Sequence, residues 1–79
     1  MHFKKGHYYI YKNIYGFYLF RYIGTRLWKN SSIRYHYCYL IKHSNFPDSS
    51  GKIDTFSNHS IIVKYSKEIS EKEAFIWAL

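Results

Sequence analysis

Histidine and cysteine are the side chains of this chain that most readily bind metals or carry protons, and it has five histidines and one cysteine. His36 and Cys38 are two residues apart on one candidate strand, so their side chains point to the same side and could share a metal ion. A zinc site needs a second such pair, and the remaining histidines are scattered along the sequence. The sequence therefore predicts no metal site and no other cofactor.

Metal-free cleavage of RNA is the enzymatic alternative, because it needs only a general base, a general acid and a cation near the phosphate. His36 beside Arg34, with His7 or His43 nearby, supplies these residue types. However, no motif fixes their geometry, no serine lies in a nucleophile elbow, and no glycine-rich loop follows a strand to hold phosphate. We expect a protein that is not an enzyme, with a ribonuclease-type toxin as the alternative.

Lysine, arginine and tyrosine are concentrated in the first 47 residues. That part holds eight basic residues and no acidic one, whereas residues 48–79 carry a net charge of −1. Nine of the ten tyrosines lie in the same basic part. Cations neutralise phosphates and release counterions, and aromatic rings stack on bases. The expected partner is therefore a nucleic acid or a nucleoprotein complex.

Arginine is the cation we expect to matter most, because it bonds a phosphate through two N–H groups and also stacks on a base. The predicted binding residues are Arg21, Arg26, Lys29, Arg34, Lys42, Tyr18, Tyr22 and His36. Tyr37 is a further stacking candidate, unless its side of the strand faces the core. A purely structural role stays open as well, since basic residues at strand edges discourage aggregation and tyrosine is a good strand former.

Short strands must position these side chains. Residues 7–12 and 17–23 are rich in aromatic residues and flank a turn of the sequence Asn-Ile-Tyr-Gly, which predicts a hairpin. Gly24 indicates a bulge near the end of the second strand. Residues 33–42 show the clearest alternation of apolar residues with mostly polar or basic ones. We expect the odd-numbered side chains of that strand to face the core, namely Ile33, Tyr35, Tyr37, Tyr39 and Ile41, and Arg34, His36 and Lys42 to point outward.

The second part of the chain predicts a loop over residues 43–52, a short edge strand over 55–57 and a further strand over 60–65. Ser70 and Glu73 then have the spacing of a capping box, in which each side chain bonds the other residue's backbone N–H. A helix from 71 to about 78 should follow, with Phe75 and Leu79 on one face.

These elements predict a mainly β protein with residues 1–79 in a single domain. We expect a small antiparallel barrel or roll of four to five strands, SH3-like or OB-like, with a short C-terminal helix. The opening Phe-Lys-Lys-Gly-His-Tyr (residues 3–8) resembles the entry to the first strand of SH3-like barrels. Cys38 has no partner for a disulfide within the chain, so aromatic side chains must supply most of the core.

The sequence also predicts where the protein works. The basic start is not followed by an apolar stretch, so we expect no signal peptide, no membrane contact and a cytoplasmic location, which suits a single cysteine. Its many Lys, Ile, Asn, Tyr and Phe residues have AT-rich codons, as in many phages and mobile elements. In size and composition the chain is similar to anti-CRISPR proteins. An inhibitor of a host nucleoprotein complex is therefore one expected function.

Overall fold

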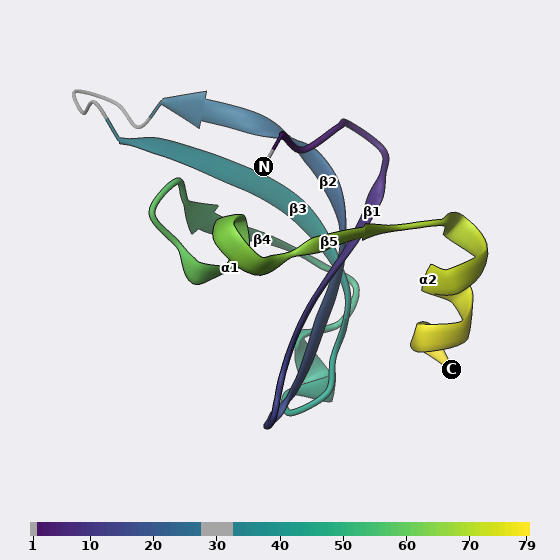
Figure 1. Cartoon of the computed structure of the whole chain (residues 1–79). Coiled ribbons are helices and arrows are strands. Elements are labelled where there is room, and N and C mark those ends of the chain that lie inside the picture. Colours follow the sequence, from purple (N-terminus) through teal and green to yellow (C-terminus); the bar gives the residue numbers. More distant parts are fainter. Residues whose placement is uncertain (1, 28–32) are drawn as a thin grey trace.

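The computed structural model of the protein describes residues 2–27 and 33–79, so the predicted binding residue Lys29 lies outside the described residues (Figure 1). The elements are, in order, β1 (Tyr8–Asn13), β2 (Gly16–Leu27), β3 (Arg34–His43), the 3-10 helix η1 (Pro47–Ser49), β4 (Lys52–Ser57), α1 (Ile61–Tyr65), β5 (Lys67–Ile69) and α2 (Glu71–Ala78).

The five strands form one antiparallel sheet in the order β4-β3-β2-β1-β5. The first four strands are consecutive neighbours, and β5 returns to pair with β1, where Tyr8 is opposite Ile69. The predicted mainly β fold with a C-terminal helix is thus confirmed. The sheet formed by the described residues is open, with β4 and β5 as its edges, so of the expected barrel or roll the structure shows an antiparallel five-stranded sheet and not its closure.

The β1–β2 hairpin forms at the predicted turn because the Asn13 side chain organises it. Asn13 Oδ1 accepts hydrogen bonds from the backbone N–H groups of Tyr15 and Gly16, at 2.8 and 3.1 Å. Glycine is required at position 16, since a Cβ atom there would collide with the Ser44 side chain. Ser44 Oγ also accepts from the Phe17 N–H at 2.7 Å, and this bond ties the turn to the end of β3.

Two irregularities in the β2–β3 pairing decide which side chains share a face. Tyr22 is opposite Cys38 but Gly24 is opposite Tyr37, so Ile23 is an extra residue in β2, as the bulge predicted near Gly24 requires. Phe20 is opposite Leu40 but Leu19 is opposite Lys42, so Ile41 is an extra residue in β3.

The inner face of the sheet, defined by Tyr9, Phe20, Cys38 and Phe56, carries the main core. Each of these four side chains is buried, and Phe3 packs against the cluster. Ile62 and Val63 of α1 also pack against this cluster. The residues that pack on this face are mostly aromatic, as the composition predicts.

The prediction that the odd-numbered residues of 33–42 face the core is wrong. The even-numbered His36, Cys38 and Leu40 are buried, whereas Ile33 and Tyr39 are 40% and 42% exposed. Alternation identifies two faces without saying which is inside, and here the pairing with β2 decides. Cys38 and Leu40 are opposite Tyr22 and Phe20, so the smaller aliphatic and thiol side chains fill the space between rings.

The outer face of the sheet carries a second, smaller core, covered by α2. Ile10, Leu19, Ile69 and Ala74 are buried there, and Trp77 packs against them. The helix begins at the predicted capping box, in which Ser70 Oγ accepts from the Glu73 N–H at 3.1 Å. Phe75 and Leu79 are 67% and 97% exposed, so the helix faces the sheet with Ala74 and Trp77 instead.

The strand predicted over 60–65 is also wrong, because residues 61–65 form the helix α1. Ser60 caps this helix, and its Oγ accepts from the Ile62 N–H at 3.2 Å. The turn brings Ile62 and Val63 together against the inner core. Tertiary packing therefore outweighs the preference of β-branched residues for strands.

Candidate nucleic-acid interface

The outer face of β3 carries a row of three tyrosines beyond the part that α2 covers. Tyr35, Tyr37 and Tyr39 are two residues apart and point to the same side, as alternate residues of a strand do. Tyr39 is 42% exposed, and the other two are half-buried. We call these three residues the tyrosine row. Its three rings lie side by side along one strand, outside the two cores.

Two arginines of β2 flank the tyrosine row. Arg26 is opposite Tyr35 and Arg21 is opposite Tyr39, and both arginines are exposed. The guanidinium carbon of Arg26 lies 5.8 Å from the centre of the Tyr37 ring, within the range of a cation–π contact. Gly24 is opposite Tyr37, and the extra residue Ile23, which is 44% exposed, lies between the two arginines along β2.

The β4 side of the row is uncharged. Ser57, Thr55 and Ile53 are opposite Tyr35, Tyr37 and Tyr39, respectively. The acidic residue of this strand, Asp54, points to the inner face, where it accepts a hydrogen bond from the Tyr18 hydroxyl at 2.5 Å. On the described outer face of β2, β3 and β4 the charged side chains are all basic, which favours a negatively charged ligand.

Two lysines extend the positive charge toward the far end of the outer face. Lys42 Nζ lies 5.8 Å from the centre of the Phe17 ring, and Lys12 Nζ lies 5.3 Å from that of Trp77. Phe17 and Trp77 meet edge to face, with ring centres 5.0 Å apart. Lys42 reaches this face because the extra residue at Ile41 shifts the pairing.

The structure brings together only some of the predicted binding residues. Arg21, Arg26 and Lys42 share the outer face. Arg34 is opposite Leu27 and follows the alternation of His36, so it lies on the inner side of the sheet. Tyr35 and Tyr39 were missed, because sequence reasoning assigned them to the core.

Tyr18, Tyr22 and His36 were predicted at the binding surface, and this is wrong because all three side chains are buried in the inner core. The Tyr22 hydroxyl lies 2.7 Å from His36 Nδ1, and His36 Nε2 lies 3.1 Å from Asn58 Oδ1. Burial and the hydrogen bond to Asp54 raise the pKa of Tyr18, so its hydroxyl stays protonated. None of these rings is open to a base.

The residues weighed for metal binding and RNA cleavage are used within the fold. Cys38 is fully buried, and burial raises the pKa of its thiol to about 11. Both ring nitrogens of His36 have partners, and His7 Nδ1 lies 3.0 Å from Glu68. No group of three His, Cys, Asp or Glu side chains in the described part of the chain could hold a metal ion.

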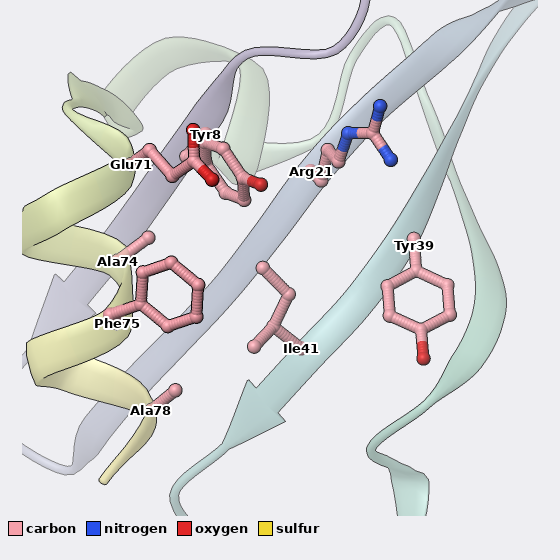
Figure 2. Close-up of a pocket in the computed structure, with 8 residues that line it drawn as sticks. All are labelled: Tyr8, Arg21, Tyr39, Ile41, Glu71, Ala74, Phe75 and Ala78. Atoms are coloured by element: carbon pink, nitrogen blue, oxygen red, sulfur yellow. The ribbon is translucent and has the colours of Figure 1, made fainter.

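A groove separates α2 from β3 and opens onto the tyrosine row (Figure 2). It has a volume of about 220 Å³ and is lined by Tyr8, Arg21, Tyr39, Ile41, Glu71, Ala74, Phe75 and Ala78. Most of this lining is apolar. Glu71 and Arg21 are its two charged residues, and Arg21 and Tyr39 belong both to the groove and to the surface around the tyrosine row.

Within residues 2–27 and 33–79, neither helix is long and apolar enough to cross a membrane. Comparisons of the chain with protein-family models, with curated proteins and with solved structures found no match. A functional proposal therefore rests on the residues of the outer face.

Proposed function

We propose that the protein is a non-enzymatic binding module that holds single-stranded nucleic acid on the outer face of its sheet. The observation that carries this proposal is the tyrosine row with Arg21 and Arg26 beside it. Rings that stack on bases and cations that neutralise phosphates are the two parts of a single-strand binding surface.

A single strand fits this surface better than a duplex does. In a duplex the base faces are already stacked on one another, so the tyrosine rings would find only phosphates and groove edges. In a single strand every base has a free face, and stacking on an aromatic side chain contributes about 1–3 kcal/mol per base. The rows of β2 and β3 also place the cations to one side of the rings, as a backbone running along the row requires.

We further propose that the sheet is an incompletely closed, SH3-like roll. Four strands follow one another in a meander, β5 returns to β1, and α1 makes the connection between the two edge strands (Figure 1). Ile62 and Val63 of α1 pack on the inner core, which supports a roll whose inner face is covered. The outer face is then the one that a strand of nucleic acid can lie across.

The test is a titration of a fluorescently labelled single-stranded oligonucleotide of about eight nucleotides, followed by anisotropy between about 50 and 200 mM salt. The double variant Arg21→Gln, Arg26→Gln should bind more weakly. Its plot of log affinity against log salt should be flatter by about 0.7 for each lost phosphate contact.

The matched control is the double variant Arg34→Gln, Lys64→Gln, which removes the same charge from the inner side of the sheet and from α1. The salt dependence of its binding should stay close to that of the parent, with only the small change that a lower net charge causes. Equal behaviour of the two double variants would mean that the outer face is not the binding surface. Cleavage of an RNA oligonucleotide during the titration would support the ribonuclease alternative instead.

A host nucleoprotein complex is the second candidate partner, with the protein acting as an inhibitor. The observation that favours it is the apolar surface of α2 beside the tyrosine row, where Phe75, Ile76 and Leu79 are exposed. A partner with both nucleic acid and protein would cover both surfaces. Capture from a host extract, with and without nuclease treatment, distinguishes it: a protein that is retained after nuclease treatment contacts this chain directly.

A further inference from the structure

We propose that the groove between α2 and β3 is a guanine-binding subsite. It would give the single strand on the tyrosine row a preference for guanosine at one position. The inference rests on the proposed function, because Arg21 and Tyr39 line the groove and also border or form the row. A base next to one stacked on Tyr39 therefore reaches the groove without leaving the strand.

The size and walls of the groove suit one planar base. Its volume of about 220 Å³ is below the range of about 300–1,000 Å³ that holds drug-sized ligands. In Figure 2 the Phe75 ring extends from α2 toward Ile41, and Tyr39 stands on the other side of Ile41. Phe75 is 67% exposed, so its ring is available for stacking. An aromatic, apolar slot of this kind favours a flat heterocycle.

The two charged groups of the groove lie toward one end. Glu71 and Tyr8 lie close together at that end, and Arg21 extends from the neighbouring strand (Figure 2). Arg21 uses its Nε atom to donate to the Gly6 carbonyl at 3.4 Å, so its terminal nitrogens remain for a ligand. The Glu71 carboxylate has no hydrogen bond or ion pair to any described residue, whereas Glu73 is used in the helix cap.

This pair of charges matches guanine better than the other bases. Guanine presents two adjacent N–H donors, N1 and N2, and a carboxylate can accept both. Its O6 and N7 atoms are adjacent acceptors, the pair that arginine recognises in specific complexes. With guanosine in the groove Arg21 would bond the base, and Arg26 would remain for the phosphates. Adenine places an acceptor where guanine has the N1 donor, so it would meet Glu71 with a lone pair. Pyrimidines lack the second pair of acceptors.

The experiment compares two labelled oligonucleotides of about eight nucleotides, a thymidine tract with one central guanosine and the same tract with one central adenosine. The parent protein should bind the guanosine oligonucleotide about tenfold more tightly, in the lower part of the range for a bidentate contact. Glu71→Gln should abolish this ratio. Glu68→Gln is the matched control, since it makes the same charge change on β5 and should preserve the ratio.

A second variant tests the groove itself. Ala78→Trp adds a large side chain to the groove wall at an exposed position, so the fold should persist, and circular dichroism checks this. This variant should bind both oligonucleotides with the parent's affinity for the adenosine form. A parent that binds both equally, or a guanosine preference that survives Glu71→Gln and Ala78→Trp, would overturn the subsite but not the tyrosine row. A parent that binds neither overturns the proposed function itself.

Discussion

The two faces of β3 differ both in their residues and in what surrounds them. On the inner face, His36 and Cys38 are sealed between the rings of Tyr22, Phe20 and neighbouring side chains. On the outer face, one residue along the strand, Tyr37 and Tyr39 meet arginines of β2 and solvent. Which side chains of β3 point into the core is thus decided by the pairing with β2 rather than by the polarity of the β3 residues.

The hydroxyl groups of the tyrosines show the same difference. On the inner face the hydroxyl groups of Tyr9, Tyr18 and Tyr22 each have a hydrogen-bond partner. The Tyr9 hydroxyl, for example, accepts from the Lys4 N–H at 2.7 Å. These bonds keep buried oxygen atoms satisfied, which a core of tyrosines requires. On the outer face, Tyr39 is 42% exposed, so its hydroxyl can instead use water. An aromatic-rich small domain can therefore place rings on both sides of one sheet.

The largest expected effect comes from removing an inner-face ring. Phe20 is fully buried and contacts the rings of Phe3, Tyr9, Tyr18 and Phe56. Phe20→Ala should lower the free energy of unfolding by about 3–5 kcal/mol, because the lost contacts leave a cavity. Tyr37→Ala, on the outer face, should cost less than about 1 kcal/mol. Denaturant titration of both variants checks this, and equal losses would contradict the assignment of the faces.

For binding, in contrast to stability, an outer-face ring should matter most. Tyr37→Ala should weaken binding of a single-stranded oligonucleotide by about 1–3 kcal/mol, the contribution of one stacked base. Anisotropy at fixed salt measures this. Tyr15→Ala is the control, since Tyr15 is exposed on the β1–β2 turn, away from the row. If the two variants bind alike, the tyrosine row does not stack on bases.

The helix α2 covers the smaller core on the outer face, and its stability depends on the capping box at Ser70. Ser70→Ala removes the acceptor for the Glu73 N–H and should lower the free energy of unfolding by about 0.5–2 kcal/mol. The helix is too short to persist without its packing, so a weaker cap should also loosen Trp77 against Phe17. Chemical denaturation followed by tryptophan fluorescence measures both effects. An unchanged midpoint would mean that packing alone holds the helix.

The smallest effect concerns the ion pair between His7 and Glu68 at the edge of the sheet. The hydrogen bond from His7 lowers the pKa of Glu68. A carboxyl group of this kind stabilises the folded state above its unfolded pKa, and the contribution is lost as pH falls through the folded value. Glu68→Gln should therefore be slightly less stable than the parent at neutral pH and equal to it at strongly acidic pH. A stability difference that persists at strongly acidic pH would be inconsistent with the pair.

Local signals predicted much of the fold. The Asn13–Gly16 turn, the bulge near Gly24 and the Ser70 cap are encoded by neighbouring residues, and all three are confirmed. The error over residues 60–65 arose because packing on the inner core, rather than local preference, makes that segment helical. The site was harder to predict. Charge asymmetry pointed to Arg21 and Arg26, which lie beside the tyrosine row, but alternation alone could not say that Tyr39 is outside and Tyr22 inside.

The pairing of β5 with β1 joins residues 67–69 to residues 8–10, almost the full length of the chain apart. During synthesis, β1 and β2 are made well before β5. Until then the outer edge of β1 has unpaired N–H and C=O groups, and such an edge readily pairs with another chain. Closing so long a loop also carries a larger entropy cost than forming any hairpin of the meander. β5 therefore covers the open edge of β1 only late in synthesis. A stalled or shortened product, which lacks β5, would be prone to aggregate through β1.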